Sequence, residues 1–201
     1  MKKVIVSLML TLGVSVTAHA AGDAQAGAAK AAVCGACHGA SGVSAAPNFP
    51  NLAGQGERYL IKQMQDVKSG ARPILEMTGM LDNLSEQDLA DIAAHFASQT
   101  PAQGAADPAL VELGEAVYRG GITAKGVPAC NACHSPTGKG NELAGFPALS
   151  GQKADYTAKQ LRAFREGERK NDGDTRIMRD IAEKLSNKEV DALASFIEGL
   201  R

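Results

Sequence analysis

The sequence predicts an all-α protein made of two tandem copies of one domain. Three observations lead to this prediction. The pattern Cys-x-x-Cys-His occurs at residues 34–38 and again at residues 130–134. The residues after the first motif recur after the second at a nearly constant offset. Apolar side chains recur at helical spacing, and no segment shows convincing strand-like alternation.

The first 20 residues have the pattern of an export signal. Lysines at positions 2 and 3 precede an apolar run over residues 4–18, and residues 18–20 read Ala-His-Ala, a small-x-small cleavage site. The run is about 15 residues long, whereas a helix needs ~20 residues to cross a bilayer. We therefore expect cleavage after Ala20, a mature chain of residues 21–201 and a periplasmic location. An uncleaved membrane anchor is the alternative.

Composition restricts the class of protein further. Of the 201 residues, 44% are hydrophobic and 21% are charged, a balance typical of globular chains and not of disordered ones. Only 4% are aromatic and none is Trp. Two domains of about 90 residues each would therefore have small cores that need an additional stabilising group or cross-link. The chain lacks a basic patch with interleaved aromatic residues, so we expect no nucleic acid partner.

Each motif contains two cysteines and a histidine: Cys34, Cys37 and His38, then Cys130, Cys133 and His134. In an exported chain four cysteines would ordinarily suggest two disulfides, but C-x-x-C-H is the signature of covalent haem attachment. Thiols at i and i+3 lie on one face of a helical turn and can each form a thioether to a vinyl group. The next residue then supplies the proximal imidazole to the iron. We expect two covalently bound haem c groups, with the four cysteines as attachment points and the two histidines as iron ligands.

Two other uses of these cysteines fit the sequence less well. A thioredoxin-like redox pair would lie in a βαβ pattern, which the sequence lacks. A zinc site would have to combine ligands from both motifs, which lie 96 residues apart, and neither motif has a second ligand pair nearby.

The duplication extends well beyond the two motifs. Residues 48–55 (Asn-Phe-Pro-Asn-Leu-Ala-Gly-Gln) match residues 145–152 (Gly-Phe-Pro-Ala-Leu-Ser-Gly-Gln) at an offset of 97. Three later pairs keep this offset: Tyr59 and Tyr156, Gln63 and Gln160, Gly70 and Gly167. Leu84-Ser85 then matches Leu185-Ser186 at an offset of 101, so the second copy has four extra residues before its last helix. The Pro-containing residues 100–108 are the predicted linker, which gives domains 21–108 and 109–201.

Helix signals occur at matching places in both copies. Ser85-x-x-Asp88 and Ser186-x-x-Glu189 predict capping boxes at the start of each last helix. Four further helices are predicted over residues 23–34, 57–69, 108–120 and 154–166.

This arrangement resembles the class I cytochrome c fold repeated twice, and the mature chain is similar to the di-haem cytochromes of the cytochrome c4 family. The resemblance is carried by both CxxCH motifs, the Asn-Phe-Pro and Gly-Phe-Pro loops, the two Gly-Gln-x-x-x-Tyr segments, residues 76–80, and residues 171–175 followed by Met178. It implies that the carbonyls of Pro50 and Pro147 accept hydrogen bonds from the proximal imidazoles.

One departure concerns the Gly-x-x-x-aromatic first helix of class I cytochromes. Gly114 with Tyr118 fits this pattern, whereas Gly27 is followed by Ala31. We therefore expect looser packing between the first and last helices of the N-terminal domain.

The sixth iron ligand decides between electron transfer and catalysis at such a haem. The second domain has a single methionine, Met178, and the offset of 101 relates it to Met77. We expect these two thioethers as ligands, and Met64 and Met80 as non-ligating. His95 is the remaining histidine of the mature chain and is not expected to bind iron. Because a thioether favours Fe(II), the haems should have high reduction potentials.

The resemblance implies an electron carrier and not an enzyme, so no catalytic residue is expected. Its expected partners are a quinol–cytochrome c reductase and a terminal oxidase, and a monomer is expected; peripheral membrane association is left open. The alternative is a di-haem cytochrome c peroxidase, which needs an open iron site for hydrogen peroxide. Residues 21–108 have a net charge of −4 and residues 109–201 of +1, a difference that would orient the molecule on its partners.

Overall fold

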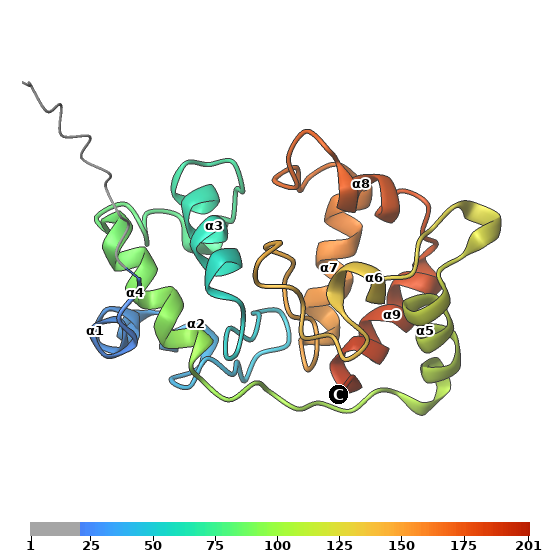
Figure 1. Ribbon diagram of the computed structural model, residues 1–201, viewed down its shortest axis with the longest axis horizontal. Coiled ribbons are helices and arrows are strands. Elements are labelled where there is room, and N and C mark those ends of the chain that lie inside the picture. The colour runs from blue at the N-terminus through green and yellow to red at the C-terminus, as the bar shows by residue number, and fades with distance from the viewer. Residues whose placement is uncertain (1–20) are drawn as a thin grey trace, which may run out of the picture.

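The computed structural model describes residues 21–201, which form two similar helical halves joined by residues 100–107 (Figure 1). These described residues contain nine α-helices, three short 3-10 helices, two isolated β-bridges and no β-strand. The all-α prediction is therefore confirmed. The predicted export signal, residues 1–20, lies outside the described residues. Within residues 21–201, no helix is long and apolar enough to cross a membrane.

With one exception, the two halves have the same order of elements. The N-terminal half contains α1 (Ala24–Lys30), η1 (Ala31–Val33), α2 (Gly35–His38), α3 (Glu57–Lys68), η2 (Leu75–Met77) and α4 (Glu86–Ala97). The C-terminal half contains α5 (Pro108–Gly120), η3 (Thr123–Lys125), α6 (Asn131–His134), α7 (Ala154–Arg165), α8 (Ile177–Ala182) and α9 (Asn187–Gly199). The exception is the 3-10 helix η2 of the N-terminal half, where the C-terminal half has an α-helix, α8. Each helix that the sequence predicts is present in the structure. The sequence patterns did not predict α8, which lies in the segment with the four extra residues.

The predicted capping boxes are present at the start of α4 and α9. Ser85 Oγ accepts a hydrogen bond from the Asp88 N–H, and the Asp88 carboxylate accepts one from the Ser85 N–H. Ser186 and Glu189 make the same reciprocal pair. These bonds satisfy N–H groups that a helix start otherwise leaves without partners, so the last helix of each half begins at a defined residue.

The first and last helices of each half cross at a glycine. A Cβ on Gly27 of α1 would lie 1.9 Å from the Asp91 carbonyl oxygen, and one on Gly114 of α5 would lie 2.3 Å from that of Ala192. Such distances exclude any side chain, so both crossings bring backbone against backbone. The looser packing expected in the N-terminal domain is therefore not found.

The apolar cores of both halves are small. The N-terminal core consists of Ala31, Leu60, Ile92, Ala93 and Phe96, with Met64 among the partly buried residues packed against it. The C-terminal core is larger and contains Tyr118, whose ring lies 5.5 Å from that of Phe196. Cores of this size leave much of the stabilisation of each half to other groups.

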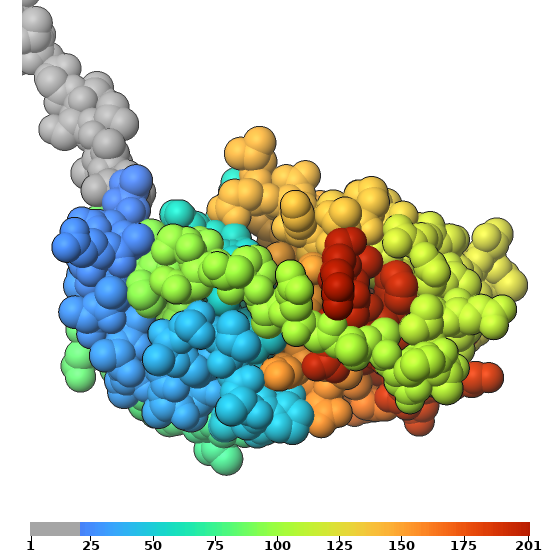
Figure 2. All heavy atoms as spheres, turned by 90° about the horizontal axis from the view of Figure 1, so that it is seen from below, coloured from blue at the N-terminus to red at the C-terminus, as the bar shows by residue number. Residues whose placement is uncertain are grey.

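The segment between α4 and α5 is packed against the protein. Figure 2 shows it crossing the surface from one half to the other. The Asp107 N–H donates to Ser195 Oγ at 2.8 Å, and the Ala102 carbonyl oxygen lies 2.0 Å from where a Cβ on Gly151 would be. These contacts attach the segment to the C-terminal half, while Pro101 at its start packs against Gly54 of the N-terminal half.

Candidate haem attachment sites

Each CxxCH motif forms a single helical turn. Cys34 precedes α2, and its carbonyl oxygen accepts hydrogen bonds from the N–H groups of Cys37 (3.2 Å) and His38 (2.9 Å). Around α6 the Cys130 carbonyl accepts the equivalent bonds from Cys133 and His134, at 3.2 and 3.0 Å. The turn therefore brings two thiols and one imidazole together in each half, as the spacing predicts. All four cysteines are unpaired thiols in the described residues.

The thiols lack the features of a redox-active pair. Burial raises the pKa of the Cys34 thiol, and it raises the pKa of Cys130 to about 11. In a thioredoxin-like motif the attacking cysteine has a lowered pKa, because the thiolate is the nucleophile. The raised pKa values therefore disfavour thiol–disulfide exchange at these two cysteines.

The imidazoles of His38 and His134 are buried and held in one orientation. Nδ1 of His38 lies 3.0 Å from the Pro50 carbonyl oxygen, and Nδ1 of His134 lies 3.0 Å from that of Pro147. A carbonyl oxygen can only accept, so Nδ1 carries the proton and Nε2 has a free lone pair. Burial lowers the pKa of both histidines, which favours the neutral form that binds metals. The proline contacts implied by the family resemblance are thus present.

The candidate methionines lie in corresponding segments of the two halves. Met77 ends η2 and Met178 belongs to α8, and both side chains are half-buried. Met80 is 45% exposed, and Met64 packs against the N-terminal core. Ligation by Met77 and Met178 stays a prediction. The half-buried ring of His95 lies on α4 beside Phe96, at 5.2 Å between ring centroids.

The sequence patterns did not identify two buried arginines that lie between the halves. Arg72 and Arg169 are 8% and 9% exposed. Among the described residues, no carboxylate forms a salt bridge with either guanidinium. Both belong to a Gly-x-Arg triplet, and the two triplets are related by the offset of 97, a signal that could have identified them.

Neutral side chains from both halves bind the two guanidiniums. Arg72 donates to Tyr156 Oη (2.9 Å) and Gln160 Oε1 (3.0 Å) of the other half, and Arg169 donates to Tyr59 Oη (3.1 Å) and to Gln63 Oε1 (2.9 Å). Although burial alone would raise it, the pKa of Tyr59 is lowered by these two cations.

A buried cation without an anionic partner is costly, so this cluster favours a negatively charged group beside it. The propionates of a haem would supply such charge. The thiols and the oriented imidazoles fit a haem in each half.

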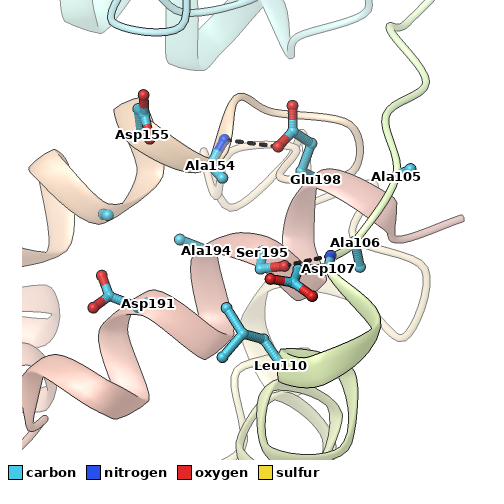
Figure 3. A pocket seen from close by; sticks show the side chains of 11 residues that line it. Ala105, Ala106, Asp107, Leu110, Ala154, Asp155, Asp191, Ala194, Ser195 and Glu198 are labelled. Carbon is cyan, nitrogen blue, oxygen red and sulfur yellow. Dashed lines mark hydrogen bonds between the residues drawn. The ribbon is translucent and has the colours of Figure 1, made fainter.

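The hollow shown in Figure 3 is a different feature. It has a volume of about 450 Å³ and lies between the linker, α5, α7 and α9. Its border includes the hydrogen bond from the Ala154 N–H to Glu198 and the carboxylates of Asp107, Asp155 and Asp191. No CxxCH residue and no candidate methionine lines it. The described residues contain no group of three or more His, Cys, Asp or Glu side chains placed to hold a metal ion.

Comparisons with known proteins agree with this geometry. The family model for cytochrome c matches residues 24–100 and 111–201. The chain is 67% identical to cytochrome c4 of Pseudomonas aeruginosa over 200 residues and 65% identical to cytochrome c4 of Azotobacter vinelandii over 209, covering all of both chains.

Among solved structures, reduced recombinant cytochrome c4 from Pseudomonas stutzeri matches with a TM-score of 0.89 and 63% identity, over 90% of this chain and 100% of that one. Two tandem cytochrome c domains, free thiols on single helical turns and oriented imidazoles are all accounted for by one assignment. The chain belongs to the cytochrome c4 family, whose members are electron carriers with covalently bound haem c.

Proposed function

We propose that each domain holds one haem c and that the chain transfers electrons one at a time. The N-terminal haem would be attached through Cys34 and Cys37, and the C-terminal haem through Cys130 and Cys133. The iron ligands would be His38 with Met77 and His134 with Met178. The observation that carries this proposal is the matched pair of histidines, each with Nδ1 3.0 Å from a proline carbonyl and Nε2 available.

The ligand set explains why the chain acts as a carrier. The haem supplies a one-electron Fe(III)/Fe(II) couple. With a buried imidazole and a thioether both bound, the iron would have no position open for a substrate such as hydrogen peroxide. A neutral thioether ligand would favour Fe(II), which would raise the reduction potential.

The cellular role follows from this chemistry and from the family. We place the carrier in the periplasm, where the pattern of residues 1–20 would direct it. It would accept electrons from a quinol–cytochrome c reductase and deliver them to a terminal oxidase of a respiratory chain. The chain would work as a monomer.

Replacement of a single methionine tests the ligand assignment. Met178→Ala should remove the far-red sulfur-to-iron charge-transfer band from one haem only. The matched control is Met80→Leu, which should leave both haems spectrally unchanged because Met80 is exposed. A full band in the Met178→Ala protein, or rapid binding of carbon monoxide to the native reduced protein, would contradict the assignment.

A further inference from the structure

One peptide group in each half has hydrogen bonds to both halves. The Pro50 carbonyl oxygen accepts from His38 Nδ1 at 3.0 Å. The N–H of that same peptide group belongs to Asn51, and it donates to Gln152 Oε1 of the C-terminal half at 2.8 Å. Because the peptide unit is planar and conjugated, its carbonyl and its N–H are polarised together.

The same arrangement occurs in the opposite direction. The Pro147 carbonyl oxygen accepts from His134 Nδ1 at 3.0 Å, and the adjoining Ala148 N–H donates to Gln55 Oε1 of the N-terminal half at 2.8 Å. The two glutamines occupy matching places in the duplicated sequence. Each glutamine is thus linked through one peptide group to the histidine of the other half, and we call this chain of two hydrogen bonds the relay. Both relays belong to the pseudo-symmetric interface between the halves.

Both glutamine amides are fixed at two points. Gln55 Nε2 donates to the Ala148 carbonyl at 2.9 Å, and Gln152 Nε2 donates to the Asn51 carbonyl at 2.9 Å. The glutamines are 6% and 9% exposed. Water therefore has little access to replace these bonds, and each glutamine has both its amide oxygen and its amide nitrogen engaged by one residue of the other half.

We infer that Gln55 tunes the reduction potential of the haem in the C-terminal domain and that Gln152 tunes that of the haem in the N-terminal domain. This inference rests on the proposed ligation by His38 and His134. A peptide whose N–H donates to a glutamine has a more negative carbonyl oxygen, since linked hydrogen bonds strengthen one another. That oxygen draws the Nδ1 proton more strongly, makes the imidazole a better electron donor and stabilises Fe(III). The intact relay thus lowers the reduction potential of the haem in the other domain.

The two relays are not identical. Asn51 also donates from its side-chain Nδ2 to the Gly151 carbonyl at 2.9 Å, and its Oδ1 accepts from the Ser44 N–H. Ala148, the matching residue, has no such side chain. The peptide beside His38 is therefore held by more bonds than the peptide beside His134, and loss of a glutamine should have the larger effect on the C-terminal haem.

The decisive experiment is a redox titration of the di-haem protein that carries Gln55→Leu, with the two haems assigned by NMR. The potential of the haem attached at Cys130 and Cys133 should rise, with a change of about two- to tenfold in its reduction equilibrium constant. The upper end corresponds to about 59 mV for a one-electron couple. The haem of the domain that contains Gln55 should change less.

Two further variants separate tuning from simple loosening of the interface. Gln55→Glu keeps an oxygen that accepts from the Ala148 N–H, so the potential should stay at or below that of the unchanged protein. Gln160→Leu removes a glutamine that binds Arg72 and Arg169 but no peptide beside a histidine, and it should not shift the C-terminal haem selectively.

A shift confined to the haem at Cys34 and Cys37, or no shift while the domains stay docked, would overturn the inference. If Gln55→Leu does not fold, NMR of the Gln55→Glu protein provides the same test. Compared with the unchanged protein, the signal of the His134 Nδ1 proton should move and that of the His38 Nδ1 proton should not. A His134→Ala protein with an unchanged haem spectrum would instead overturn the proposed ligation, so the two failures are distinguishable.

Discussion

Lys30 Nζ lies 2.5 Å from Oδ2 of Asp91, a carboxylate that is 5% exposed where α1 crosses α4. Asp91 also accepts hydrogen bonds from the Asp23 N–H (2.9 Å) and from Gln87 Nε2 (2.8 Å). In the C-terminal half the matching residue is Ala192. A charged cluster thus packs beside the N-terminal helix crossing, whereas the ring of Tyr118 packs beside the C-terminal crossing.

This charged cluster should make the N-terminal domain sensitive to acid. The Asp23 N–H, Lys30 and Gln87 lower the pKa of Asp91 to about 2 from its ordinary value of 3.8. A lowered folded-state pKa adds stability that is complete above the unfolded pKa and is lost as pH falls through the folded one. The free energy of unfolding of this domain should therefore fall between about pH 4 and pH 2. Denaturant titrations at each pH would measure it.

Asp91→Asn should flatten this acid dependence while lowering stability at neutral pH. The control is Asp155→Asn, which removes an exposed carboxylate from the C-terminal half and should leave the acid dependence unchanged. An acid profile in Asp91→Asn identical to that of the unchanged protein would show that other carboxylates cause the loss.

The close helix crossings predict a second stability effect. Gly27→Ala and Gly114→Ala each place a Cβ within 2.3 Å of a backbone carbonyl oxygen of the last helix, so the helices must separate. Overpacking of this kind costs about 1–3 kcal/mol. Thermal and denaturant unfolding would measure the loss. Gly120→Ala is the control, since its Cβ would meet no atom within 4 Å, and it should keep or slightly raise stability.

The sequence predicts local features better than contacts between distant segments. Ser85 and Ser186 mark helix starts because the capping partner lies three residues away. The contact of His38 with Pro50 spans 12 residues and follows from the family pattern. The bond from Asn51 to Gln152 spans 101 residues and depends on how the two halves dock, which periodicity and spacing do not encode. The short helix α8 also has no side-chain cap from which its start could be predicted.

The buried arginines predict an electrostatic effect on potential. Arg169→Gln removes a buried positive charge that opposes Fe(III), so the reduction potential of the neighbouring haem should fall. Spectroelectrochemical titration would measure the change. Arg58→Gln is the matched control: the same charge is removed from an exposed side chain at the interface, so the change should be smaller and should shrink further as salt is added. Equal shifts in both variants would show that burial has no part in the effect.

The uneven charge of the two domains predicts which haem holds the first electron. The N-terminal domain has a net charge of −4 and the C-terminal domain of +1, while the expected axial ligands are the same. Negative surroundings stabilise Fe(III), so the haem at Cys34 and Cys37 should have the lower potential. In the half-reduced protein the electron should reside mainly on the haem at Cys130 and Cys133, and NMR signals of each ligand methionine would locate it. Because the Debye length is about 8 Å at physiological salt, raising the ionic strength should bring the two potentials closer. An electron mainly on the haem at Cys34 and Cys37, or a gap that does not change with salt, would mean that hydrogen bonds close to the iron outweigh the surface charge.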